Sequence, residues 1–152
     1  MTSAVETTLT KLSSMLKGMG MFASVAQVEP KGAPGSGLTC AVFLNTIFPA
    51  AAASGLNAAT GYYVYTIRIY TNMLQEPVEK IDTILAHAVD KVFTALMGDC
   101  DLGANVRNID VFGELGTQLK AVAGYVDVDK VMYRSVDITL PLILNDVWTL
   151  SA

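Results

Sequence analysis

The sequence has few charged residues and few of the side chains that bind metals or form covalent intermediates. Asp, Glu, Lys and Arg make up 16% of the 152 residues, whereas a typical domain carries about 25%. The chain has one histidine, His87, and two cysteines, Cys40 and Cys100, far apart in sequence. Without a Cys-x-x-Cys motif or a ligand pair at helical spacing, we expect no metal site and two reduced, mostly buried thiols.

Motifs for nucleophilic catalysis and for phosphate binding are also missing. There is no Gly-x-Ser-x-Gly, and His87 is the one histidine that could serve a cysteine nucleophile as a base. Gly18 and Gly20 precede strand-like residues, so they lack the strand-then-helix context of a dinucleotide-binding loop. The sequence therefore predicts no enzyme activity and no cofactor.

Basic and long apolar segments are scarce as well. The net charge is −4 and the ten Lys and Arg residues are scattered, which argues against a nucleic-acid-binding surface. Residues 32–67 contain no charge, but prolines and glycines divide them into pieces too short to span a bilayer, and we expect no membrane partner. The first residues show no signal-peptide pattern.

Hydrophobic residues, in contrast, are abundant at 52% of the chain. A monomer of this composition would leave large apolar areas in water, and such areas usually contact partners. The composition therefore favours an assembly.

Hydrophobic periodicity predicts two helices, at residues 3–17 and 77–97. Ser3 and Glu6 fit a capping box before the first helix, and Pro77 and Gly98 suit the two ends of the second. Its apolar face is predicted to include Ile84, with His87 on the polar side.

Alternating apolar residues predict the strands, of which 21–28 is the weakest candidate. The predicted strands are residues 21–28, 38–48, 62–70, 106–112 and 131–144, and the predicted loops are 29–37, 49–61 and 115–123. Both faces of 38–48 are expected to be covered. Pro141 cannot donate to a ladder, so strand 131–144 should lie at an edge or end its pairing there.

This order of elements predicts an α+β fold in one domain, residues 1–152. Its mainly antiparallel, mixed sheet should carry the helix 77–97 on one face, and there is also an N-terminal helix. Residues 102–114 contain an arginine and two acids, but no histidine or lysine that would make a reaction centre, so we interpret them as a connector. The Asp99-Cys100-Asp101 triplet is interpreted as a turn rather than an ion site.

One polar pair and two loops are the candidate contact residues. Arg68 and Asp137 lie on the less apolar side of their strands, where they could pair within one chain, pair across a subunit boundary or stay solvated separately. The loops 29–37 and 49–61 are nearly free of charge, so we expect them to contact other subunits or rings. The candidate contact residues are Pro30, Lys31, Pro34, Phe48, Pro49, Leu56, Arg68 and Asp137.

Four segments after the leading helix carry a resemblance to a known family. They read EPKGAPGSGLTCAVFLNTIFPA, YYVYTIRIYTNMLQEP, IDTILAHAVDKVFTALMGDCDLGANVRNID and AGYVDVDKVMYRSVDITLPLILNDVW. In this order they resemble the tail terminator proteins of long-tailed bacteriophages, particularly phages that infect actinobacteria. The resemblance covers nearly all of the chain and rests on the order of the segments and on their residues, without a single diagnostic motif.

The resemblance implies a structural virion protein in the tail or neck, assembled in the host cytoplasm. Such proteins form a ring, usually of six subunits, on the last ring of the tail tube, where they stop tube growth and present a surface to the head connector. The implied partners are other copies of the chain, the tail tube protein and the connector protein. DNA would pass through the lumen without specific binding, and no catalytic residues or cofactor are implied.

The sequence is also compatible with two other classes of protein. Another neck component, such as a head-completion or connector protein, shares small α+β folds and ring symmetry. A small soluble enzyme or ligand-binding module is a different class. It is disfavoured because the sequence lacks a group of polar residues that could form a catalytic or binding site.

Overall fold

The computed structural model describes residues 4–27, 38–51, 54–72, 80–103, 106–128 and 130–150. They form two helices and six strands, which confirms the α+β class. The elements are α1 (Ala4–Gly18), β1 (Ser24–Ala26), β2 (Thr39–Pro49), β3 (Ala58–Asn72), α2 (Ile81–Gly98), β4 (Asn108–Ile109), β5 (Lys120–Val128) and β6 (Val131–Thr149).

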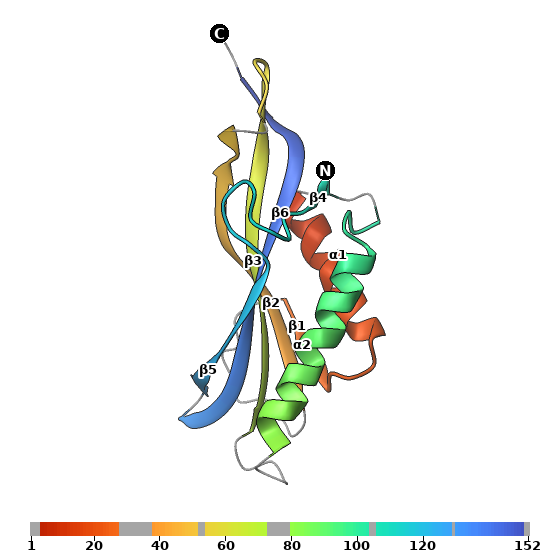
Figure 1. Ribbon diagram of the computed structural model, residues 1–152, viewed down its shortest axis with the longest axis vertical. Helices are drawn as coiled ribbons and strands as arrows, with labels where there is room; N and C mark the ends of the chain where they lie inside the picture. The colour runs from red at the N-terminus through yellow and green to blue at the C-terminus, as the bar shows by residue number, and fades with distance from the viewer. Residues whose placement is uncertain are drawn as a thin grey trace.

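All six strands belong to one sheet, which is strongly curled along its length (Figure 1). Its order is β1-β2-β3-β6-β4, and β5 pairs with β6 on the side where β4 lies. The β1–β2 pair is parallel and all the others are antiparallel. β3 and β6 are rich in β-branched and aromatic residues, which favour extended backbone, and they form the long centre of the sheet.

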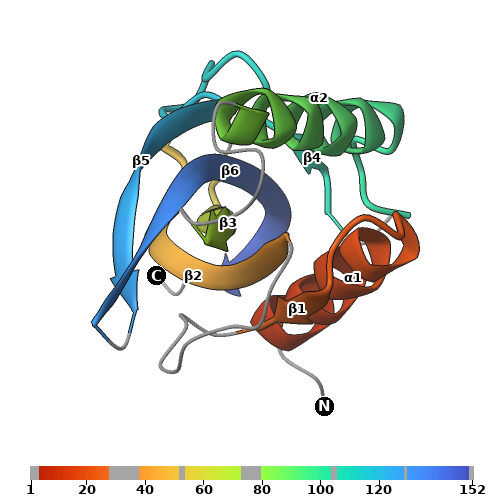
Figure 2. The same cartoon turned by 90° about the horizontal axis from the view of Figure 1, so that it is seen from below.

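The main core lies between the two helices and one face of this sheet (Figure 2). Five residues of α2 are buried at helical spacing, and Leu85 and Val92 among them belong to one cluster with Ile67 of β3 and Ile138 of β6. α1 contributes the fully buried Leu12 and Leu16 to the same cluster. We call this side of the sheet the helix-covered face.

The opposite side, here called the far face, holds two smaller apolar clusters. One surrounds Tyr70 and Tyr133, and the other surrounds Tyr62 and Ile143. Alternate residues of β3 and β6 point to the two faces, so the same strands supply both sides. The far face is therefore apolar at its two ends.

Several predicted boundaries were wrong. β5 begins at Lys120, so residues 120–123 are strand although they were predicted to be loop. β6 continues to Thr149, beyond the predicted end at residue 144. The predicted loop 49–61 is shorter, because β2 includes Pro49 and β3 begins at Ala58. Of the predicted strand 106–112, only Asn108–Ile109 is a strand, although the N–H groups of Arg107 and Asp110 also donate to β6. The backbone turns at residues 111–112.

Pro141 does not place β6 at an edge, because β6 lies in the middle of the sheet. Pairing with β5 ends at Thr139, and the carbonyl of Pro141 accepts a hydrogen bond from the N–H of Asp110, at 3.0 Å. A residue in an antiparallel strand directs its N–H and C=O toward the same neighbour. The missing donor of Pro141 therefore falls at the junction where β5 leaves and β4 begins.

Two further expectations need correction. Only residues 39–42 of β2 are buried in a continuous run, whereas residues 44–47 are exposed, so the two faces of this strand are not both covered throughout. Ile84 of α2 is also exposed rather than part of the buried stripe. Ser3 and Pro77, predicted to start the helices, lie outside the described residues.

Candidate interaction surface

The strand ends at one end of the sheet leave apolar side chains in water. Leu56, just before β3, is 95% exposed, and Trp148 and Leu150 at the end of β6 are also exposed. The N–H of Leu150 donates to the carbonyl of Asn57 at 2.7 Å, so these two segments lie side by side. The Trp148 ring stacks on Tyr63 at a centroid distance of 6.1 Å. The apolar surface predicted at Leu56 therefore extends onto the end of β6.

Phe48 and Pro49 end the neighbouring strand β2. The ring of Phe48 is partly buried because it stacks on Tyr62, with centroids 4.7 Å apart, whereas Pro49 is exposed. Phe48 thus belongs partly to the far-face cluster around Tyr62 and partly to the surface.

A buried polar network that the sequence did not predict fixes the loop at residues 110–119 above Tyr62. Asp110 is 4% exposed, and its carboxylate accepts from the Tyr62 hydroxyl at 2.7 Å. The same carboxylate accepts from the N–H groups of Glu114 and Leu115 at 2.9 and 3.0 Å. Hydrogen bonds to a buried carboxylate are stronger than neutral ones. This network therefore holds the start of the loop firmly against the sheet.

The other side of the loop is fixed by the Tyr62 hydroxyl and by Gly113. The hydroxyl lies 2.6 Å from the carbonyl of Thr117, and it accepts from the Thr117 N–H at 2.9 Å. Burial and the Asp110 hydrogen bond raise the pKa of Tyr62 above its usual range, so the hydroxyl stays protonated. Gly113 has φ +73°, and a Cβ there would lie 2.9 Å from the backbone N of Gln118. Only glycine suits this position.

Phe112 projects from this loop and is 84% exposed. Phe112 precedes Gly113 directly and is followed at Glu114 by a second exposed side chain. An aromatic ring held outward by a fixed backbone loses little conformational entropy on binding a partner. Phe112 therefore joins Leu56, Trp148 and Leu150 as a candidate contact residue.

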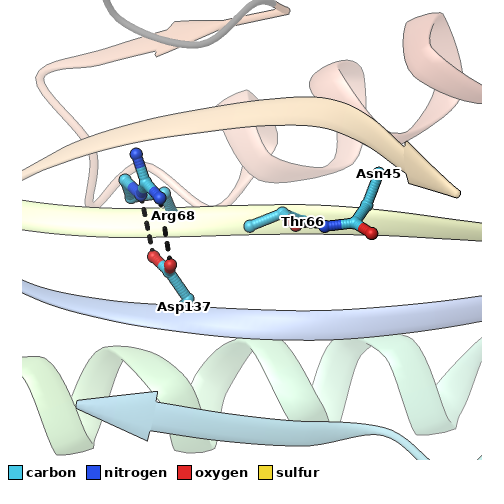
Figure 3. A network of polar contacts seen from close by, with 4 residues as sticks. All are labelled: Asn45, Thr66, Arg68 and Asp137. Carbon is cyan, nitrogen blue, oxygen red and sulfur yellow. Dashed lines mark hydrogen bonds and ion pairs between the residues drawn. The ribbon is translucent and has the colours of Figure 1, made fainter. Parts of the chain in front are cut away.

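Arg68 and Asp137 pair within one chain, which settles the alternative that the sequence left open (Figure 3). They are opposite each other in the β3–β6 register, and the guanidinium binds both carboxylate oxygens, at 2.9 and 3.1 Å. Their side chains are 17% and 39% exposed. The Arg68 guanidinium also lies 5.4 Å from the centroid of Phe43. Neither residue needs a charge from a partner subunit.

Next to this pair, Asn45 donates to the Thr66 hydroxyl at 3.4 Å (Figure 3). These polar side chains lie between the two apolar clusters of the far face. The remaining candidates, Pro30, Lys31 and Pro34, lie outside the described residues.

A second ion pair lies on the other side of the sheet. Arg134 of β6 binds Asp82 of α2 at 2.9 Å, donates to the carbonyl of Gly124 and lies over the ring of Tyr125. The hydrogen bond from Arg134 holds the pKa of Asp82 below its ordinary value. Arg134 thus links α2 to β5 across an open groove of about 310 Å³.

The described residues offer little for metal or thiol chemistry. They contain no group of three or more His, Cys, Asp or Glu side chains placed to hold an ion. Neither cysteine is in a disulfide, and desolvation raises the pKa of the buried Cys40 thiol to about 12, where it is a poor nucleophile. Cys100 lies in the turn after α2, as the Asp99-Cys100-Asp101 triplet predicts. Neither described helix is long and apolar enough to cross a membrane.

Comparisons with known proteins find remote likenesses among the solved structures alone. No family model matches the sequence, and no curated protein matches it. The fold is similar to that of a chain from the virion of a native gene transfer agent particle, with a TM-score of 0.41 and 14% identity. The alignment covers 89% of this chain and 92% of that chain. At this distance the likeness carries no argument about function.

Proposed function

We propose that this chain is a structural virion protein that forms a ring at the head-proximal end of a phage tail tube. The ring, of six subunits, stops tube polymerisation and provides the docking surface for the head connector. The whole chain, residues 1–152, acts as one tail-terminator-like domain without catalytic residues or a cofactor. It assembles in the host cytoplasm and remains in the tail of the virion.

One structural observation supports this proposal above the others. Two large apolar side chains, Leu56 and Phe112, are almost fully exposed, and Phe112 lies in a loop that a buried carboxylate holds in place. Exposed apolar residues of this size usually mark a contact with another protein. The sequence resemblance to tail terminators supplies the kind of assembly, and the acidic balance suits a lumen through which DNA passes without being held.

Tail length after disruption of the gene tests this role. We expect electron micrographs of the parent phage to show overlong tubes without heads, because nothing would stop polymerisation. Tails of normal length that remain unattached to filled heads would instead make the protein a joining component of the neck. Normal, infectious particles would refute a structural role.

A surface substitution tests which residues make the contacts. Leu56→Asp should block incorporation into particles but leave the monomer folded, because the side chain is 95% exposed. Phe48→Asp should also block incorporation, but its ring packs on Tyr62, so its fold must be checked by circular dichroism. Met97→Asp, an exposed apolar position at the end of α2, is the matched control. Normal incorporation of Leu56→Asp would refute this loop as a contact.

A further inference from the structure

We infer that Phe112 of one copy inserts into an apolar pocket beside α2 of the next copy. This inference rests on the proposed ring and names the contact that joins its subunits. The ring of Phe112 is the anchor, and the exposed Glu114 follows it two residues later in the chain.

The receiving pocket has a volume of about 240 Å³ and lies between α2 and the strand side of the core. Met21, Leu38 and Ala88 give it an apolar lining, while the exposed His87 and Lys91 lie at its α2 side. A single aromatic side chain is the kind of group such a pocket takes, since buried aromatic anchors in apolar pockets dominate protein interfaces.

Charge complementarity favours a second copy as the partner. The exposed Glu114 is two residues from the anchor and Lys91 lines the pocket, so insertion of Phe112 would bring opposite charges into the same contact. The two sites therefore match in polarity and in charge.

The two sites cannot meet within one chain. The loop of Phe112 packs over Tyr62 on the far face, whereas the pocket is lined by Thr71 at the other end of β3 and by α2 on the helix-covered face. Tyr62 and Thr71 are nine positions apart on β3, a span of about 30 Å at roughly 3.3 Å per residue. A contact between different patches of identical chains is heterologous, and it closes into a ring when the rotation allows.

Photocrosslinking tests this contact directly. Full-length protein with benzoylphenylalanine in place of Phe112 is irradiated both in purified particles and as a concentrated solution. We expect a covalent pair of copies whose adduct maps to Met21, Leu38 or Ile84 of the second copy. An adduct elsewhere on the second copy, or no covalent pair in either sample, would overturn the inference.

Charge reversal sharpens the test, with the yield of the covalent pair as its measure. Lys91→Glu and Glu114→Lys should each lower the yield by about threefold to tenfold, and the double variant should restore it to within about twofold. Lys17→Glu, an exposed lysine at the end of α1, is the control and should change nothing. Failure of the double variant to recover would exclude this pairing of sites.

The crosslinking result and the proposed function can be judged independently of each other. If the protein is found in purified particles by mass spectrometry but its adduct maps elsewhere, the structural role stands and this contact is wrong. If the protein is absent from particles, the proposed function fails, and the adduct formed in concentrated solution decides the contact alone.

Discussion

The two faces of the sheet use different physical means. The helix-covered face is one continuous apolar cluster, in which side chains such as Leu85 and Ile138 exclude water completely. The far face separates two small apolar clusters by the Arg68–Asp137 pair and anchors a loop through Asp110. Burial on the first face therefore supplies most of the stability, whereas polar contacts on the second set the position of the exposed surface.

Truncating a residue of the helix-covered face should have the largest effect. Ile138→Ala should lower the free energy of unfolding by about 2–5 kcal/mol, because it removes buried methyl groups and leaves a cavity. Urea denaturation measures this loss. Val122→Ala on β5, where the side chain is 58% exposed, should cost less than about 0.5 kcal/mol. Similar losses at both positions would contradict the division of roles.

Removing the carboxylate of Asp110 should have the second-largest effect on the free energy of unfolding. Asp110→Ala leaves the N–H groups of Glu114 and Leu115 without their acceptor and removes one of the two acceptors of the Tyr62 hydroxyl, which should cost about 1–3 kcal/mol. Hydrogen exchange at the amides of Glu114 and Leu115 should accelerate more than exchange in β3.

Glu114→Ala is the control for Asp110→Ala, since its exposed side chain should not affect the loop. If the Asp110 variant lost stability without faster exchange in residues 110–119, the network would be supporting the core rather than fixing the loop.

The sequence predicted elements whose periodicity is strong and local. α2 has a buried residue at every third or fourth position, and β3 alternates β-branched and aromatic residues, so their existence followed from the pattern. β5 was missed because Ala121, Ala123 and Gly124 weaken its alternation, and its pairing with β6 decides its structure.

The candidate surface was predictable only in part. Leu56 stood out as an apolar residue in an uncharged loop, and the alignment of Arg68 with Asp137 was a stated possibility. The anchoring of the loop at 110–119 could not be predicted, because Asp110 and Tyr62 are 48 residues apart and nothing in the local sequence indicates their contact. Such long-range hydrogen bonds depend on the register of strands, which a sequence pattern does not give.

The Arg68–Asp137 pair should make a smaller contribution than Asp110. A double-mutant cycle of Arg68→Ala and Asp137→Ala should give a coupling energy of about 0.5–1 kcal/mol, because Asp137 is 39% exposed and solvent screens the pair. The bidentate geometry should keep the coupling above zero. Zero coupling in the unfolding free energies would mean that packing around Phe43, rather than the charge, accounts for the effect of Arg68.

Substitution of Asp82, on the exposed side of α2, should have the smallest effect on stability, and this effect should depend on pH. The Arg134 hydrogen bond lowers the pKa of Asp82 from its ordinary 3.8, so the pair adds stability above about pH 4 and loses it as the pH falls through the lower, folded-state value. Asp82→Asn should therefore reduce stability slightly at pH 7 and flatten its decline in acid, whereas Asp90→Asn on the same helix should not. Because an exposed pair is screened by ions, 1 M NaCl should remove the difference between the two variants. A difference that persisted in high salt would show that Asp82 acts through the packing of Arg134 on Tyr125, and that this polar contact orients β5 as Asp110 orients its loop.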